Sequence, residues 1–283
     1  MEDRYDGLNY FSRPGELNNF SYWFPKIENC GMKVPQSVVV SVPQDIQEAF
    51  YVEGAEDYEK IAAFVAEKIQ PAADEIRRPL LFIKNGGFSN KFDADGSCLC
   101  SSDYHELVSH ITTIQYQSLC METGGEDEIV IRERIPYNSE VIPCIYSGLP
   151  LRPEFRVFYD FDLREVLFTV NYWGYDYCRP HIFNATDKII FDKMKTHLEK
   201  AFELCKEMVE SAVAEAMKNV NGLSGPWSID VMLDNYPPSV QADVIQDITA
   251  TYSRPSDRYD MWLIDMATAE RSAYWDRRPS KNV

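Results

Sequence analysis

The sequence predicts an α+β protein built of two lobes. In the first half, short β-branched segments alternate with amphipathic ones, and the second half begins with two consecutive strand-like segments. The longest amphipathic segment then precedes two further strand-like segments. The order is therefore strand-helix-strand-helix-strand, then a hairpin, a long helix and a strand pair. That order indicates an α+β fold and not a doubly wound parallel sheet.

The elements of the first half follow from apolar spacing and from turn residues. "SVVVSVP" (Ser37–Pro43) is β-branched and bounded by prolines, which predicts a strand. "AEDYEKIAAFVAEKIQ" predicts a helix, because apolar residues recur at helical spacing; they are Tyr58, Ile61, Ala62, Val65 and Ile69. "PLLFIK" and "EIVIRERI" predict strands, and "SDYHELVSHITTIQ" predicts a helix capped by Ser102 or Asp103.

In the second half, "EFRVFYDF" and "EVLFTVNYW" predict a hairpin whose turn contains Asp162–Arg164. A helix is predicted from about Thr186 to Val220. Its apolar stripe consists of Ile189, Ile190, Met194, Leu198, Phe202, Cys205, Val209, Val213 and Met217. "WSIDVML" and "MWLIDMA" predict two closing strands. The long polar stretch Asp234–Asp260 separates them, and such stretches are typical of functional lids or disordered insertions.

Composition excludes several classes of protein. Of the 283 residues, 45% are hydrophobic, which indicates a folded chain, and the net charge of -17 disfavours general nucleic-acid or anionic-membrane binding. No apolar run approaches the roughly 20 residues that span a bilayer, and the acidic start "MEDRYDGLNYF" is unlike a signal peptide. We therefore expect a cytoplasmic protein. Its seven scattered cysteines predict reduced thiols, and Cys98-x-Cys100 lacks the second pair that a zinc site needs.

The stretch "LLFIKNGGFSNKFDADG" is the first candidate site. Lys84 ends a predicted strand and is followed at once by Gly86-Gly87. Glycines let backbone N–H groups approach a phosphate, and a lysine ammonium neutralises its charge. The stretch matches neither a Walker loop nor a dinucleotide fingerprint. Taken alone, these residues favour the simpler interpretation, a strand and a turn with a solvated lysine.

Two aspartates form the second candidate site. Asp230 and Asp265 each lie inside an otherwise apolar strand, "WSIDVML" and "MWLIDMA". If the two strands are neighbours, their carboxylates come together, and such a pair is costly unless a cation holds it. Mg²⁺ suits this arrangement, because it takes one or two carboxylates together with substrate phosphates. The alternative is that both side chains point to solvent.

Arginines and aromatic residues supply the remaining candidates. Arg132 and Arg134 share one face of the strand "EIVIRERI", and Arg156 lies in the strand "EFRVFYDF". In so acidic a chain, cations that converge on one place would form an anion site, whereas surface arginines at strand edges are the simpler alternative. The cluster "NYWGYDY" (Asn171–Tyr177) could stack on a base, although packing in the core is commoner.

These features, in this order, resemble the ATP-grasp superfamily, and within it the cell division cycle protein 123 family. That family consists of ATP-binding assembly chaperones for the gamma subunit of translation initiation factor 2. The matching segments are "FSYWFPKIENCGMKVPQSVVVSVPQDI", "LLFIKNGGFSNKFDADGS", "EIVIRERI", "PEFRVF" and "WSIDVML … MWLIDMA". The resemblance implies an ATP-grasp fold, in which two α+β lobes clamp Mg-ATP. It places an N-terminal strand and helix segment at 1–75, a small lobe at 76–137 and a large lobe at 138–283.

The resemblance also implies roles for single residues. Lys84 would contact the α- or β-phosphate, with Ser89 in the covering loop. Backbone groups from Glu133 to Ile135 would bind the adenine edge, beside Arg132 and Arg134. Arg156 would face the phosphates, and Asp230 and Asp265 would hold Mg²⁺.

The sequence departs from the family pattern in several places. Asp265 is followed by Met266-Ala267-Thr268 where the family has F-N-P, and Ala267 cannot bind a metal. "NSEVIPCIYSGLPLR" lengthens the connection before the E-F-R strand, the Lys84–Ser89 spacing is one residue wider, and Asp234–Asp260 is inserted. These changes indicate a divergent branch, bacterial or viral.

Two functions fit these residues. The first, which the sequence favours slightly, is an ATP-dependent ligase that joins a carboxylate, through an acyl phosphate, to an amine or other nucleophile. Lys84 and Arg156 would then be the catalytic residues, and the acceptor would be an unidentified small molecule, peptide or protein. The second is a non-catalytic assembly chaperone or adaptor, in which ATP and Mg²⁺ govern the binding of a protein partner.

Overall fold

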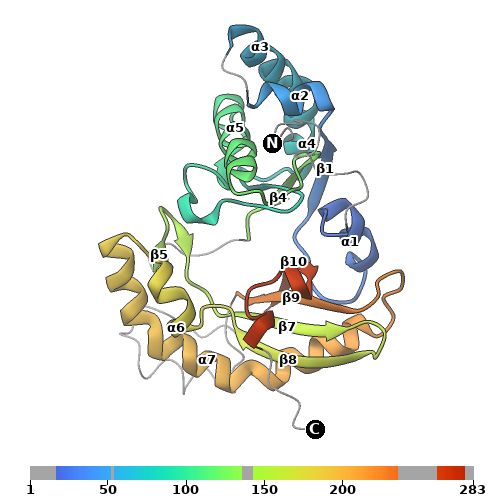
Figure 1. The fold of residues 1–283 in the computed structure, drawn as a ribbon, viewed down its shortest axis with the longest axis vertical. Coiled ribbons are helices and arrows are strands. Elements are labelled where there is room, and N and C mark those ends of the chain that lie inside the picture. Colours follow the sequence, from blue (N-terminus) through green and yellow to red (C-terminus); the bar gives the residue numbers. More distant parts are fainter. Residues whose placement is uncertain (1–16, 52–53, 136–142, 235–259, 278–283) are drawn as a thin grey trace, which may run out of the picture. The chain divides into compact units, whose positions relative to one another are not determined.

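The computed structural model describes residues 17–51, 54–135, 143–234 and 260–277 (Figure 1). The chain forms two compact units, which we describe separately. The first unit comprises Met1–Phe24, Gln36–Arg134 and Tyr146–Leu149, and the second comprises Pro25–Pro35, Ile135–Ile145 and Pro150–Val283. Helix α1 (Phe20–Ile27) begins in the first unit and ends in the second.

The first unit is a four-stranded antiparallel sheet with helices packed on it (Figure 1). The strand order is β1-β4-β2-β3, so β2 pairs with β4 on one side and with β3 on the other. The strands are β1 (Ser37–Ser41), β2 (Leu80–Asn85), β3 (Leu99–Ser101) and β4 (Glu128–Glu133). The helices are α2 (Gln44–Ala49), α3 (Ala55–Phe64), α4 (Gln70–Ile76) and α5 (Tyr104–Cys120), and Asp103 caps α5 as predicted.

The predicted helix "AEDYEKIAAFVAEKIQ" forms, but it is longer and contains a π-helical segment, Val65–Ile69, between α3 and α4. The N–H of Gln70 donates to the carbonyl of Val65, five residues back. Pro71 follows at once and has no N–H to donate, which explains the change of hydrogen-bond register here. The apolar stripe was predicted to include Tyr58, and this is wrong, because 59% of that side chain is exposed.

The second unit contains the other antiparallel sheet, in the order β10-β9-β7-β8, with the long helix α7 packed against β7 and β8 (Figure 1). The predicted hairpin and closing strand pair are both present. The strands are β7 (Glu154–Asp160), β8 (Glu165–Asn171), β9 (Pro226–Leu233) and β10 (Met261–Thr268). A short hairpin of β5 (Cys144–Ile145) and β6 (Leu149–Pro150) precedes them, and α6 (Tyr175–Cys178) follows β8.

Helix α7 spans Ala185–Met217, close to the predicted bounds. It begins at Asn184, whose side-chain oxygen accepts hydrogen bonds from the N–H groups of Thr186 and Asp187, the usual role of an N-cap residue. Most of the predicted stripe is buried, but Ile189 is 55% exposed and does not belong to it.

The predicted insertion Asp234–Asp260 lies outside the described residues except at its two ends. There, Asp234 accepts hydrogen bonds from the N–H of Asp260 and from the indole of Trp262. The two ends are thus held together at the tips of β9 and β10. Within the described ranges, no helix combines the length and apolar character that crossing a bilayer requires.

Candidate functional site

Lys84 and Arg132 lie on one face of the first sheet. β2 and β4 pair so that Lys84 is opposite Val130 and Phe82 is opposite Arg132. Because alternate residues of a strand share a face, Lys84 and Arg132 are diagonal neighbours. Only 3% of Lys84 and 4% of Arg132 are exposed. The simpler interpretations of a solvated lysine and a surface arginine are therefore wrong for these two residues.

The ring of Phe20, at the start of α1, faces both cations. The Nζ of Lys84 is 5.9 Å from the ring centroid, and the guanidinium carbon of Arg132 is 5.1 Å from it. Phe20 itself is fully buried. The Nε of Arg132 also donates to the Oγ of Ser37 on β1, at 3.2 Å. Two cations thus lie over one aromatic ring, which attracts each by roughly 0.5–2 kcal/mol.

The glycine-containing loop after Lys84 is held by hydrogen bonds of its own backbone N–H groups. The side-chain oxygen of Asn85 accepts hydrogen bonds from the N–H groups of Gly87 and Phe88, at 3.0 and 2.6 Å. The N–H of Gly86 donates to the carbonyl of Gly125. These three N–H groups are engaged, so the glycines do not present them to a phosphate as the sequence suggested. Ser89, the predicted covering residue, follows in this loop and is half-buried.

The glycines are needed here for close packing. A Cβ built on Gly125, whose φ is +88°, would lie 2.2 Å from the backbone nitrogen of Gly87. A Cβ on Gly86 would lie 2.6 Å from a carboxylate oxygen of Glu128. The two loops can approach each other only because neither of these residues has a side chain. This packing fixes the loop beside the end of β2.

Two acidic residues at the start of β4 anchor the start of α1. The side-chain amide of Asn19 donates to both carboxylate oxygens of Asp127, at 2.9 and 3.0 Å. The backbone N–H of Ser21 donates to Glu128, at 3.1 and 3.4 Å to its two oxygens. Glu128 is 4% exposed, and a carboxylate at the N-terminus of a helix is favourably placed. These contacts hold Phe20 in position.

Asp127 should make stability depend on pH. Its pKa is raised to about 6, chiefly by burial and also by the charges of Glu128 and Glu126, against the opposing hydrogen bond from Asn19. The folded state therefore binds a proton that the unfolded state binds only at lower pH, so ionised Asp127 costs stability above about pH 6. Between pH 7 and pH 5, the wild type should gain stability relative to Asp127→Asn.

Urea unfolding of both proteins at the two pH values measures this difference. Asp45→Asn, at an exposed position of α2, is the control and should follow the wild type at both pH values. An equal change with pH in Asp127→Asn and the wild type would contradict the assignment.

The predicted adenine-binding segment lies at the end of β4. The N–H of Glu133 donates to the carbonyl of Gln36, and that of Arg134 donates to the carbonyl of Leu80. Both N–H groups thus belong to the sheet, so an adenine contact would use other backbone groups. The carbonyl of Ile135 accepts a hydrogen bond from Arg152 at 3.5 Å.

Arg134 is half-buried and lies toward β3. Burial raises the pKa of Cys98 and Cys100, and the charge of Arg134 partly opposes this for both thiols.

All seven cysteines are free, as predicted. Within the described ranges, no three His, Cys, Asp or Glu side chains are grouped to hold a metal.

The second sheet brings Arg156, Asp230 and Asp265 into one row. Arg156 on β7 is opposite Asp230 on β9, and Asp230 is opposite Asp265 on β10. The two aspartates are therefore neighbours, as the sequence predicts. Asp230 is only 4% exposed, so the interpretation that it points to solvent is wrong. Asp265 is half-buried.

Arg156 forms a bidentate ion pair with Asp230. Its Nε and Nη2 donate to the two carboxylate oxygens, both at 2.7 Å. The side chains are 13% and 5% exposed, so water screens the pair weakly. Burial alone would lower the pKa of Arg156, but the attraction of Asp230 outweighs it and the pKa is raised. Arg156 therefore remains positively charged in the pair.

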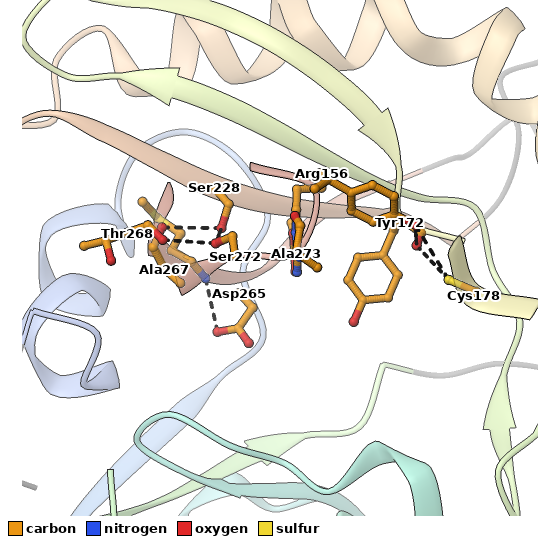
Figure 2. Close-up of polar contacts among 12 residues, drawn as sticks. Arg156, Tyr172, Cys178, Ser228, Asp265, Ala267, Thr268, Ser272 and Ala273 are labelled. Atoms are coloured by element: carbon orange, nitrogen blue, oxygen red, sulfur yellow. Dashed lines mark hydrogen bonds and ion pairs between the residues drawn. The ribbon is translucent and has the colours of Figure 1, made fainter. Parts of the chain in front are cut away.

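Further groups hold Arg156 from the side (Figure 2). Its guanidinium carbon lies 4.9 Å from the centroid of the Tyr172 ring, and its Nη1 donates to the carbonyl of Ala273 at 3.4 Å. The hydroxyl of Tyr274 in turn donates to the carbonyl of Tyr172 at 3.0 Å. The segment after β10 thus folds back over the ion pair. Tyr274 has a φ of +74°, which is unusual for a bulky residue.

The side chains around Asp230 and Asp265 can supply only some of the ligands that a magnesium ion needs. Mg²⁺ needs oxygen ligands, and Asp265 can supply a carboxylate, whose Oδ1 accepts from the N–H of Met266 (Figure 2). Both oxygens of Asp230 are engaged by Arg156. Ala267, in the position of the family's asparagine, offers no side-chain oxygen. An ion held by Asp265 and completed by phosphates and water fits these residues, but a second ion does not.

Sequence reasoning missed the residues that surround the charged groups. Phe20 lies in the aromatic segment "FSYWF", and Tyr172 lies in "NYWGYDY", so a signal was present as aromatic clustering. The spacing of the aromatic residues does not reveal that Phe20 lies against Arg132 and that Tyr172 lies against Arg156. Ala273 contacts Arg156 through its backbone carbonyl, and Glu128 accepts a hydrogen bond from a backbone N–H at the start of α1. Neither contact can be predicted from a sequence pattern.

Comparison with known proteins is informative for structure only. No protein-family model and no curated protein matches the sequence. The two antiparallel α+β units have the ATP-grasp fold, which confirms the predicted class. In particular, the fold is similar to that of Cdc123 from Schizosaccharomyces pombe, with a TM-score of 0.52 and 15% identity over 94% of this chain and 92% of that chain.

A C-terminally truncated form of the same Cdc123 gives the same values. D-alanine–D-alanine ligase from Bacillus anthracis, in complex with ATP, is more distant. Its TM-score is 0.34, with 12% identity over 77% of this chain and 49% of that chain. The similarity to Cdc123 confirms, for the fold alone, the resemblance noted in the sequence.

Proposed function

We propose that the protein binds ATP and uses it, without consuming it, to control the binding of a protein partner, as an assembly chaperone or adaptor. The observation that carries nucleotide binding is the convergence of Lys84 and Arg132, both buried, on the ring of Phe20. Two neighbouring cations in a chain of net charge -17 supply positive charge of the kind that a polyanion requires. The phosphates of ATP are such a polyanion, and the fold of Cdc123 supports this choice.

The acidic residues of the second unit favour binding over catalysis. Phosphoryl transfer needs metal ions that neutralise the charge developing on the transferred group. Here Asp230 is bound through both oxygens to Arg156, and Ala267 cannot act as a ligand. The neighbouring carboxylate of Asp265 would then be the main ligand of Mg²⁺, together with the phosphates. A single ion can support tight nucleotide binding, which is what a chaperone requires.

The ligase predicted from the sequence is the second candidate. The four charged residues that a ligase would use are all present, namely Lys84, Arg156, Asp230 and Asp265. Each is partly or fully buried, whereas charged side chains at a protein surface are usually exposed. In a ligase, Arg156 would leave Asp230 and stabilise the phosphates of the transition state, while Lys84 would hold a phosphate. No covalent nucleophile on the protein is required.

Two measurements test the proposal. Isothermal titration calorimetry with ATP should show binding that is stronger in the presence of Mg²⁺, and the absence of binding to the folded protein would contradict both candidates. The protein is then incubated with Mg-ATP and a panel of amino acids, peptides and cell extract. The chaperone is supported if the ATP stays intact and if a defined partner protein stays bound to this protein only when nucleotide is present. Release of ADP and phosphate together with a new adduct identifies the ligase instead.

A further inference from the structure

The segment that follows β10 and its 3₁₀ turn, Ser272–Trp275, folds back onto the Arg156–Asp230 ion pair, and we call it the strap (Figure 2). The strap contacts Arg156 through the backbone carbonyl of Ala273, which accepts from Nη1 at 3.4 Å. That distance is long for a guanidinium, whose hydrogen bonds to charged oxygens are usually about 2.7–2.9 Å. A neutral carbonyl thus occupies, through a weak bond, a donor that suits an anion better.

Two hydroxyl groups attach the strap to its surroundings. The hydroxyl of Ser272 lies 2.5 Å from that of Ser228 on β9, and either can donate. The hydroxyl of Tyr274 donates to the carbonyl of Tyr172, which follows β8, at 3.0 Å. The ring of Tyr172 also lies against the guanidinium of Arg156. One residue therefore contacts both the strap and the arginine.

The backbone of the strap is strained where these contacts meet. Tyr274 has a φ of +74°, a left-handed conformation that costs free energy in a bulky residue. Next to it, the ring of Trp275 packs against Phe158 and Phe168, with centroid distances of 5.4 and 6.0 Å. The side-chain contacts hold the strap in this conformation, and its own backbone opposes it. The closed strap is therefore easier to displace than its contacts alone suggest.

We propose that the strap is the element through which nucleotide acts on this protein: a phosphate oxygen displaces the Ala273 carbonyl from Arg156, and the strap opens. The inference rests on the proposed nucleotide binding and adds the means of its control. Arg156 stands in one row with Asp230 and Asp265 across the sheet. Phosphates that share a magnesium ion with Asp265 are therefore brought towards this row.

The exchange leaves the ion pair intact. Arg156 bonds to Asp230 through Nε and Nη2, whereas the carbonyl of Ala273 is on Nη1. A guanidinium donates a stronger hydrogen bond to a phosphate oxygen than to a neutral carbonyl, so the exchange is favourable. Opening exposes the aromatic side chains of Tyr274 and Trp275. A surface that changes when nucleotide binds is what a chaperone controlled by ATP requires.

Trypsin cleavage after Arg271, an exposed residue just before the strap, measures its opening. The wild type without nucleotide should be cut slowly there. Mg-ATP should accelerate the cut, and so should Mg-tripolyphosphate, which has no base, whereas adenosine should not. Mass spectrometry identifies the products. Cleavage after Lys193, an exposed residue of α7, reports general unfolding and should keep its rate.

Tyr274→Phe removes one hydrogen bond of the strap and keeps the ring. Without nucleotide, cleavage after Arg271 should be about 2- to 12-fold faster, as expected for the loss of one hydrogen bond. Calorimetry should show ATP binding tighter by a similar factor, because the nucleotide no longer has to break that bond. Ser272→Ala removes the other hydroxyl and should act in the same direction. Tyr175→Phe, which removes a hydroxyl bonded to Asp192 outside the strap, is the control and should change neither quantity.

Weaker or unchanged ATP binding in Tyr274→Phe would overturn the inference, because the strap would then not oppose the nucleotide. So would ATP that binds to the wild type without accelerating cleavage after Arg271, or that accelerates cleavage after Arg271 and Lys193 alike. In each of these cases the proposed function stands. A wild-type protein that binds no ATP would instead overturn the proposed function, and the inference with it.

Discussion

Lys84→Met should weaken ATP binding about 10- to 150-fold, which corresponds to the roughly 1.5–3 kcal/mol of a hydrogen bond to a charged group. Lys84 is 3% exposed and lies one residue before the end of β2, where its backbone is paired with Val130 of β4. Methionine has a similar length and removes the charge without opening a large cavity. Urea unfolding of Lys84→Met reports the folding of the variant, so that a loss of ATP affinity is read on folded protein.

Calorimetry with ATP measures the predicted loss of affinity. Lys68→Met serves as the control: it removes an exposed lysine from the π-helical segment of the same unit and should leave the ATP affinity unchanged. If Lys84→Met bound ATP as the wild type does, Lys84 would have no contact with the phosphates. The assignment of the phosphate site to this face of the sheet would then be wrong.

The sequence predicted the arrangement of strands well because that arrangement depends on local patterns. β-branched runs, turn residues and the apolar stripe of α7 gave the order of elements. The neighbouring positions of Asp230 and Asp265 followed from the last two strands alone, and their register confirms it. The π-helical segment was missed because a single residue, Pro71, changes the hydrogen bonding of a helix whose apolar spacing is otherwise regular.

The contacts of the charged groups could not be predicted from local patterns. Whether a lysine at a strand end is solvated or buried depends on α1, more than sixty residues earlier in the chain. Gly86-Gly87 matched the composition of a phosphate loop, yet the glycines serve the close approach of Gly124-Gly125. Arg156 and Asp230 were assigned to different ligands, since nothing in their spacing showed that β7 and β9 are paired.

Breaking the Arg156–Asp230 pair should have the largest effect on stability. Asp230→Asn leaves a buried guanidinium without its bidentate partner, and the loss of one member of a buried ion pair costs about 3–5 kcal/mol. Arg156→Met should cost a similar amount, because it leaves two neighbouring carboxylates. The double variant Arg156→Met/Asp230→Asn should be less destabilised than the sum of the single variants, because neither buried charge then remains. Urea unfolding of the four proteins gives the coupling, and additive losses would show that the ion pair does not stabilise the fold.

Magnesium should distinguish the two single variants. In Arg156→Met, Asp230 no longer binds the arginine and lies beside Asp265, so two carboxylates can take one ion. An ion that binds only the folded state stabilises it, and Mg²⁺ should therefore restore part of the lost stability. In Asp230→Asn one carboxylate remains, and Mg²⁺ should restore much less. Equal responses to Mg²⁺ in the two variants would mean that Arg156 does not compete with a metal for Asp230. The argument that the ion pair weakens the metal centre, and with it the preference for a chaperone over a ligase, would then fail.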